Sequence, residues 1–138
     1  MRCQQRSANE LFLVKKSVGG DAAILRHQIK KRIAEFFSLD QCHYVTRAEI
    51  TTRGKELVIC CAEGKGLKKT VRALIANAAK LGFDYVRYHP KTARAGAAMA
   101  RIAGETVTAV QEPNAYYLLI DLRGRYGRQQ VEPNAANQ

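Results

Sequence analysis

Hydrophobic and polar positions follow two different periods in the middle of the chain. Residues Leu57–Ala62 form a nearly continuous apolar run, which is typical of a strand buried on both faces. Beyond Gly64 and Gly66, apolar residues recur at helical spacing and predict a helix over Leu67–Leu81. Its expected buried positions are Leu67, Val71, Leu74, Ile75 and Ala78. The pattern therefore predicts a strand, a two-glycine turn and an amphipathic helix in direct succession.

This succession predicts an anion site at the turn. The first N–H groups of a helix lack intrahelical acceptors, and the helix dipole places partial positive charge there. Phosphates bind at such helix starts. Gly64 and Gly66 permit positive φ and close backbone approach. Lys65, Lys68 and Lys69 add positive charge, so a phosphate or another anion fits this turn.

The other apolar patterns predict the remaining elements. A stripe through Leu25, Ile29, Ile33 and Phe36/Phe37 predicts a helix capped by Asp21. The run Leu11–Val14 fits either a strand or part of a helix. Further elements are a strand over Tyr44–Thr52 in a hairpin with Leu57–Ala62, a strand over Phe83–Tyr88, a helix over Ala93–Ala103 and strands over Glu105–Val110 and Tyr116–Leu122.

The order of these elements predicts an α/β fold. The unit from Leu57 to Tyr88 is expected to be a right-handed parallel crossover, while the flanking hairpins are antiparallel. We expect a mixed, mostly antiparallel central sheet with helices on both faces. Residues 1–20 are interpreted as a basic arm, 21–122 as a single domain, and 123–138 as a basic and polar tail.

Composition adds a strong positive charge to this picture. The 138 residues carry a net charge of +11, which favours anionic partners such as nucleic acid or nucleotides, although a solvated basic surface explains it equally well. No apolar run approaches a membrane span, and no secretion signal is visible, so a soluble cytoplasmic protein without membrane contact is expected.

The four cysteines do not form a metal motif. Cys3, Cys42, Cys60 and Cys61 contain no Cys-x-x-Cys pair, so neither a zinc knuckle nor another metal site is expected. Cys60 and Cys61 are adjacent in a strand and are expected to point to opposite faces. Cys60 has no visible partner that would make it a nucleophile.

The stretch Cys61-Ala62-Glu63-Gly64-Lys65-Gly66, together with the elements downstream of it, resembles the GNAT N-acyltransferase superfamily. That family carries Arg/Gln-x-x-Gly-x-Gly/Ala between an apolar strand and a long helix. A glycine that ends the helix, a strand, a shorter helix and a further glycine come next in the family, and Gly82, Phe83–Tyr88, Ala93–Ala103 and Gly104 match them. The resemblance covers about residues 44–122, and the short length is similar to small phage-encoded members.

The resemblance implies that acetyl-CoA is the cofactor. Backbone amides of Gly64, Lys65, Gly66, Leu67 and Lys68 would face its pyrophosphate. The strand Val58–Cys61 would splay from the strand Phe83–Tyr88, and the pantetheine arm would lie in that gap, pairing with the backbone of Ile59 and Cys61. An amine would attack the thioester, and strand N–H groups would hold the developing oxyanion.

Three positions depart from the family pattern. Cys61 stands where the family usually has Arg or Gln, and Glu105 replaces an aromatic residue. Ala100 stands where many members carry a tyrosine that protonates the leaving thiolate. These departures affect the expected activity more than the expected fold.

Candidate proton-transfer groups are few. Glu49 and Glu56 lie on the predicted hairpin, where family members sometimes place a general base, although solvated sheet-edge carboxylates explain them as well. His43 and His89 lie near strand ends and read more readily as structural residues. Glu63 either opposes a phosphate or caps the helix after it.

Two functions from different classes fit the sequence. The first is a GNAT-like acyltransferase that binds acetyl-CoA at Gly64–Gly66 and acetylates an unknown amine. The second is a catalytically degenerate GNAT-like phage protein that acts in the virion or in assembly, contacting other subunits or nucleic acid, in the host cytoplasm or the virion. Tail cations Arg123, Arg125 and Arg128 are the candidate contacts for nucleic acid or a partner.

Overall fold

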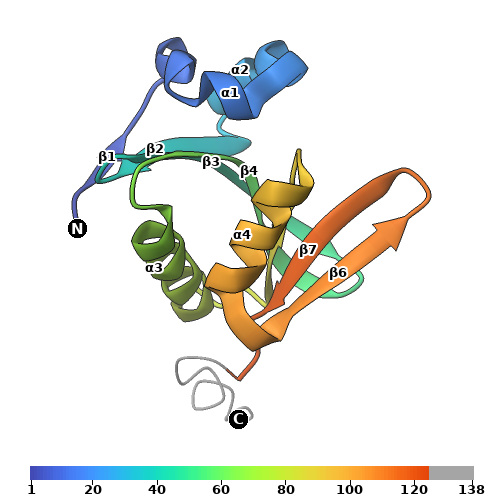
Figure 1. The fold of residues 1–138 in the computed structure, drawn as a ribbon. Coiled ribbons are helices and arrows are strands. Elements are labelled where there is room, and N and C mark those ends of the chain that lie inside the picture. The colour runs from blue at the N-terminus through green and yellow to red at the C-terminus, as the bar shows by residue number, and fades with distance from the viewer. Residues whose placement is uncertain (125–138) are drawn as a thin grey trace, which may run out of the picture.

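A seven-stranded mixed sheet forms the centre of the computed structural model, which describes residues 1–124 (Figure 1). The strand order is β1-β2-β3-β4-β5-β7-β6. The strands are β1 (Cys3–Gln5), β2 (Ala34–Leu39), β3 (Cys42–Thr51), β4 (Gly54–Gly64), β5 (Tyr85–Tyr88), β6 (Val107–Glu112) and β7 (Ala115–Asp121). Only β4 and β5 pair in parallel among the described strands, which confirms the predicted mixed, mostly antiparallel sheet.

Helices cover both faces of the sheet, as predicted. The short segments η1 (Ala8–Val14), α1 (Lys15–Val18), η2 (Gly19–Asp21) and α2 (Ala22–Lys30) lie over one face, called the α1/α2 face. On the opposite face, called the α3/α4 face, lie α3 (Leu67–Lys80) and α4 (Ala93–Ala103), the latter followed by η3 (Gly104–Thr106). None of the helices among residues 1–124 is long and apolar enough to cross a membrane.

The predicted β–α–β crossover is confirmed as β4–α3–β5. The buried side chains of α3 include Val71, Leu74, Ile75 and Ala78. They pack on the apolar positions of β4 and β5 that share their face, among them Ile59 and Val86. The apolar face of α3 thus packs on a strand that is buried on both faces, and this burial fixes the crossover.

The helix predicted from Asp21 through Phe37 is wrong beyond Lys30. The chain turns at Arg32, whose φ is +61°, and β2 begins at Ala34. Side chains alternate in β2, because Phe36 packs toward the α1/α2 face, whereas Phe37 stacks on Tyr44 of β3 with ring centroids 5.8 Å apart. Apolar residues at 33, 36 and 37 fit the helical and strand periods alike, and the pairing of β2 with β3 decided the outcome.

The segment predicted as an arm, residues 1–20, differs from that expectation. Cys3–Gln5 pair with β2 at the edge of the sheet. Leu11, Val14 and Val18 are buried beneath the N-terminal helical layer. These apolar side chains cover the α1/α2 face, which would otherwise expose Phe36 and its apolar neighbours to water.

A β-bulge in β4 overturns the expectation that Cys60 and Cys61 face opposite ways. Val45 pairs with Cys61 and Thr46 with Ile59, so Cys60 has no register partner in β3. Both cysteines therefore pack against the core cluster of the α1/α2 face, whereas Ile59 lies in the cluster of the α3/α4 face. One extra residue has shifted the alternation of side chains.

Candidate active site

The turn between β4 and α3 leaves free space and unpaired N–H groups at the N-terminus of α3, where an anion could bind. Gly66 has φ +80°, and an added Cβ there would meet no atom within 4 Å. Thr70 N–H donates to the Gly66 carbonyl, which makes it the first backbone bond of α3. The N–H groups of Leu67, Lys68 and Lys69 precede that bond and have no intrahelical acceptor, and no side chain caps the helix.

Two of the five predicted phosphate-binding positions, Lys65 and Gly64, have a structural role of their own. The Lys65 N–H donates to the Gln41 carbonyl at 3.3 Å. A Cβ on Gly64 would lie 2.2 Å from that same carbonyl oxygen, so the backbone of the turn between β2 and β3 requires glycine there whether or not a ligand binds. The donors left for an anion are Gly66, Leu67 and Lys68, joined by Lys69.

The pairing of β4 with β5 ends at Ile59, and this position, where β5 stops and β4 runs on, is called the strand divergence. Their parallel register runs from Glu56 with Tyr85 to Ile59 with Tyr88, the last residue of β5, while β4 continues to Gly64. Cys60 therefore lies at the point of divergence, with no register partner in β5 or, because of the bulge, in β3. Sequence reasoning named Ile59 and Cys61 as the backbone contacts and missed Cys60, since a bulge leaves no signal in the apolar pattern.

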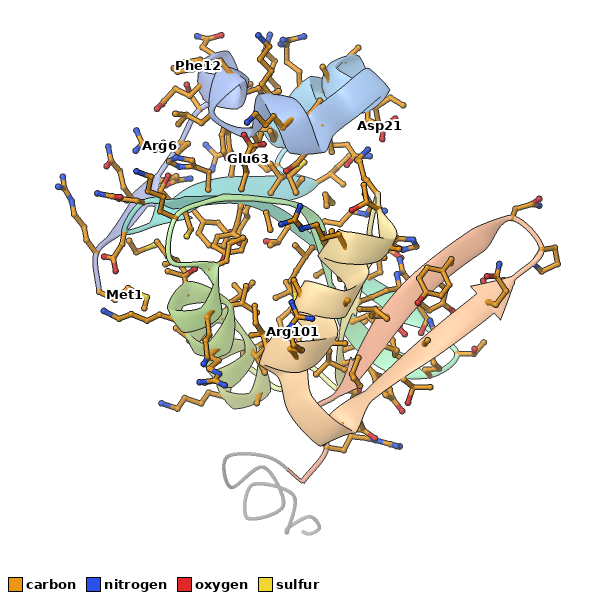
Figure 2. All side chains as sticks on the ribbon, in the orientation of Figure 1. Met1, Arg6, Phe12, Asp21, Glu63 and Arg101 are labelled. Carbon is orange, nitrogen blue, oxygen red and sulfur yellow. The ribbon has the colours of Figure 1, made fainter. Side chains whose placement is uncertain are left out.

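Helix α1 is hydrogen-bonded to the end of β4 through Ser17. Ser17 Oγ donates to the Ala62 carbonyl at 3.1 Å, and its N–H donates to Glu63 Oε1 at 2.9 Å. Glu63 lies beneath this helical layer (Figure 2). The interpretation of Glu63 as a cap of α3 is therefore wrong, and its carboxylate is drawn away from the anion site.

A cavity of about 470 Å³ opens on the α1/α2 face where β4 and β5 diverge. Its walls come from the N-terminal helices, the end of β4 and the chain just after β5. The polar side chains that line it are Ser17, Asp21, Gln28, Arg47, Cys60, His89 and Lys91. Its volume suits a small molecule, and it borders the strand divergence.

His89 is the histidine that lines this cavity. Its ring packs on Tyr117 at a centroid distance of 5.1 Å. Partial burial, followed by the charges of Arg87 and Arg47, lowers the pKa of His89 below its usual 6.5. The imidazole is therefore neutral near pH 7 and has a lone pair for a proton. His43 lies elsewhere, with Nδ1 2.6 Å from Ser38 Oγ.

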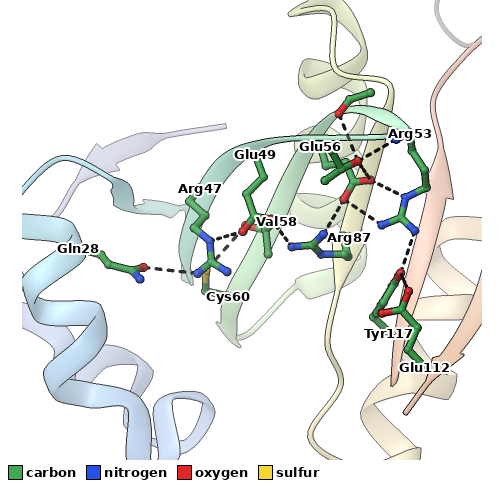
Figure 3. Close-up of polar contacts among 12 residues, drawn as sticks. Gln28, Arg47, Glu49, Arg53, Glu56, Val58, Cys60, Arg87, Glu112 and Tyr117 are labelled. Carbon is green, nitrogen blue, oxygen red and sulfur yellow. Dashed lines mark hydrogen bonds and ion pairs between the residues drawn. The ribbon is translucent and has the colours of Figure 1, made fainter. Parts of the chain in front are cut away.

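A row of alternating charges runs across the same face (Figure 3). In order it contains Arg47, Glu49, Arg87, Glu56 and Arg53. Each carboxylate is shared by two guanidinium groups at distances between 2.6 and 2.8 Å. The row links β3, β4 and β5 and borders the cavity at its Arg47 end.

These contacts disfavour Glu49 and Glu56 as general bases. Burial alone would raise the pKa of Glu56, but hydrogen bonds from Arg53 and Thr51 and the charges of Arg53 and Arg87 outweigh it and lower the pKa. The same balance, with Arg47 and Arg87, lowers the pKa of Glu49. A carboxylate held in this way is a poor proton acceptor, and both oxygens of Glu56 are already occupied.

Neither cysteine of β4 is an activated thiol. Burial raises the pKa of Cys60 despite the nearby charge of Arg47, and burial raises the pKa of Cys61 to about 12. Ala100 packs against the core cluster of the α3/α4 face and carries no proton donor. Among residues 1–124 no three His, Cys, Asp or Glu side chains come together in a group that could hold a metal ion.

Of the three tail cations, Arg123 lies in the described part of the chain, while Arg125 and Arg128 lie outside it. Arg123 pairs with Asp121 at 2.8 Å and lies over the Tyr85 ring at 5.1 Å from its centroid. Asp121 therefore partly neutralises the charge that was expected to contact a phosphate.

Comparison with known proteins adds no sequence relative, because no family model and no curated protein matches. Solved structures do match. The AtaT–AtaR complex bound to DNA aligns with a TM-score of 0.60 at 10% identity, over 95% of this chain and 99% of that one. An N-acetyltransferase from Staphylococcus aureus Mu50 aligns with a TM-score of 0.57 at 11% identity, over 89% and 98%. The fold is that of the GNAT N-acetyltransferases.

AtaTR bound with acetyl-CoA is a further neighbour of this GNAT fold, with a TM-score of 0.57 at 9% identity over 94% of this chain and 96% of that one. The resemblance seen in the sequence is thus confirmed for the fold. At such low identity the likeness carries no residue roles, which must be argued from the geometry of this chain.

Proposed function

We propose that the protein is a GNAT-like acetyltransferase that binds acetyl-CoA and acetylates an amine held in the cavity beside His89. The observation that carries the proposal is the divergence of β4 from β5 at Cys60, next to a helix start with unpaired N–H groups and open space at Gly66. Acetyl-CoA supplies an acetyl group activated as a thioester. Gly66, Leu67, Lys68 and Lys69 would hold its pyrophosphate, since their amides and two lysines converge there.

The chain's own groups support the chemistry at the divergence. The backbone of Cys60 lies outside both strand registers, and its amide is the candidate donor to a developing oxyanion. Ile59 is the last β4 residue that pairs with β5, whereas Cys61 lies beyond that pairing. His89 would accept the proton of the attacking amine, in place of Glu49 and Glu56.

Acetyl-CoA binding tests the proposal by thermal shift and calorimetry. At 100 times its dissociation constant, the ligand should stabilise the protein by about 2.7 kcal/mol. Gly66→Glu should lower the affinity more than tenfold, because a carboxylate would face the pyrophosphate. Gly82→Glu is the matched control, since Gly82 has φ +89° and equally open space at the other end of α3. Equal affinity in both variants, or no shift with wild type, would contradict the proposal.

Nucleic-acid or protein contact remains the second candidate. The observation in its favour is a basic surface on α2 and the turn after it, where Arg26, Lys30, Lys31 and Arg32 are all exposed. The virion and phage interpretations stay predictions from the sequence.

Retention on immobilised DNA or RNA, measured against salt, tests this second candidate. Changing Lys30, Lys31 and Arg32 to alanine should elute the protein at lower salt and reduce the salt slope by up to about three. Arg123→Ala should have a smaller effect, because Asp121 already pairs with it. Unchanged elution of the triple variant would count against nucleic-acid contact through α2.

A further inference from the structure

Arg47 lines the cavity with a guanidinium group that is fixed by hydrogen bonds but still has a free donor. Its Nε donates to Glu49 at 2.6 Å, and its Nη1 makes longer contacts of 3.4 Å with Gln28 Oε1 and Cys60 Sγ. Its Nη2 has no partner within residues 1–124, and 28% of the side chain is exposed. The group is therefore oriented before any ligand arrives, which reduces the entropy lost on binding.

The charge row leaves positive charge at this end. It begins and ends on arginine, so its three guanidinium groups exceed its two carboxylates. At the far end, Arg53 donates to Tyr117 Oη, which in turn donates to Glu112. No equivalent acid completes the row at Arg47 within residues 1–124, where the neighbours Gln28 and Cys60 are neutral. An anion from outside the chain would complete it.

Two lining residues of the cavity, Arg47 and His89, suit two different groups of one small molecule. His89 and Arg47 line the same cavity of about 470 Å³, and the charge of Arg47 acts on the pKa of His89. A planar guanidinium matches the geometry of a carboxylate, and such charge-assisted hydrogen bonds are among the stronger ones. Lys91 also lines the cavity, but Asp21, 3.8 Å away on the same wall, balances its charge, so Arg47 is the cation left for a carboxylate.

We infer that the acceptor is a small amino-carboxylate, whose carboxylate binds Arg47 while its amine meets His89. This inference rests on the proposed acetyl transfer and specifies its substrate class. Transfer forms a bond from the amine nitrogen to the acetyl carbon and breaks the carbon–sulfur bond of the thioester. The amine proton goes to His89, and coenzyme A leaves as its thiol after taking up a proton.

The test compares acceptors that differ only in the carboxylate. Linear ω-amino acids of two to six carbons are paired with their terminal amides, and coenzyme A release gives kcat/KM. The wild-type protein should prefer at least one acid over its amide by about 10- to 100-fold. Arg47→Met should remove that preference, Arg47→Lys should retain part of it, and Arg26→Met, an exposed cation on α2 outside the cavity, should leave it intact.

Calorimetry separates this inference from the proposed function. In the presence of coenzyme A, the preferred acid should bind wild type at least tenfold more tightly than Arg47→Met. Acetyl-CoA binding with equal use of acids and amides, or with use of neither, would overturn the inference and leave the cofactor proposal standing. Absence of acetyl-CoA binding would overturn both. The comparison within wild type needs no variant, so a misfolded Arg47→Met does not block it.

Discussion

Glu56→Gln should lower the free energy of unfolding by about 3 kcal/mol, the largest stability effect expected from a single polar substitution here. Glu56 is fully buried, and its carboxylate accepts bonds from Thr51, Arg53 and Arg87. The variant keeps the shape but leaves Arg87, whose side chain is 12% exposed, with one carboxylate in place of two. Urea unfolding measures the effect.

The pH dependence of that stability identifies its electrostatic origin. The pKa of Glu56 is lowered in the folded state, so its contribution is fully present above the unfolded-state pKa near 4.5 and is lost as the pH falls through the lower folded value. The gap between wild type and Glu56→Gln should therefore narrow on acidification. Glu35→Gln, an exposed site on β2, serves as the control and should change little. A gap that stays constant down to low pH would contradict the ion-pair explanation.

His89→Gln should reduce kcat/KM for acetyl transfer by about 10²- to 10⁴-fold and leave acetyl-CoA affinity within twofold. The reason is that glutamine retains polarity but cannot accept a proton from the amine. Stopped-flow or steady-state release of coenzyme A measures the rate, and calorimetry measures the affinity. His43→Gln is the matched control, because His43 bonds Ser38 and does not line the cavity.

The pH profile distinguishes a base from a merely structural imidazole. Because the pKa of His89 is lowered below 6.5, the imidazole should be mostly neutral at pH 7, and wild-type activity should fall as the pH drops through this lowered pKa. This acid limb should be absent from His89→Gln, whose remaining pH dependence should reflect the amine substrate. The same acid limb in both proteins would show that another group accepts the proton.

The expected effects of Glu56→Gln and His89→Gln are linked, because Glu56 pairs with Arg87 and the charge of Arg87 acts on His89. Arg87 pairs with Glu56 and Glu49, and its guanidinium lies 5.7 Å from the centroid of the Tyr117 ring, on which His89 packs. Loss of the Glu56 charge would leave more positive charge near His89 and lower its pKa further. The buried ion pairs therefore support the position and the protonation state of His89 as well as the stability of the fold.

The local pattern of the sequence was sufficient for the central crossover. Each of its three parts has one clear reading in the sequence: a continuous apolar run for β4, two glycines for the turn and a helical apolar period for α3. The parallel pairing with β5 follows from this order. The positive φ and open space at Gly66 agree with the expected anion turn. The other glycine has a different reason, since Gly64 is required by the close backbone of Gln41.

Tertiary contacts decided the elements for which the spacing of apolar residues fits more than one structure. Ile33, Phe36 and Phe37 fit a helix or a strand, and pairing with β3 made two of them part of β2. The bulge at Cys60 changed which backbone lies at the divergence, and the shared arginines made Glu49 and Glu56 structural ions. The sequence by itself determined the order and type of the central elements, because these depend on neighbours in the chain. Only the tertiary structure placed His89 and Arg47 in one cavity, because strand register, a one-residue bulge and ion pairing join residues far apart in sequence.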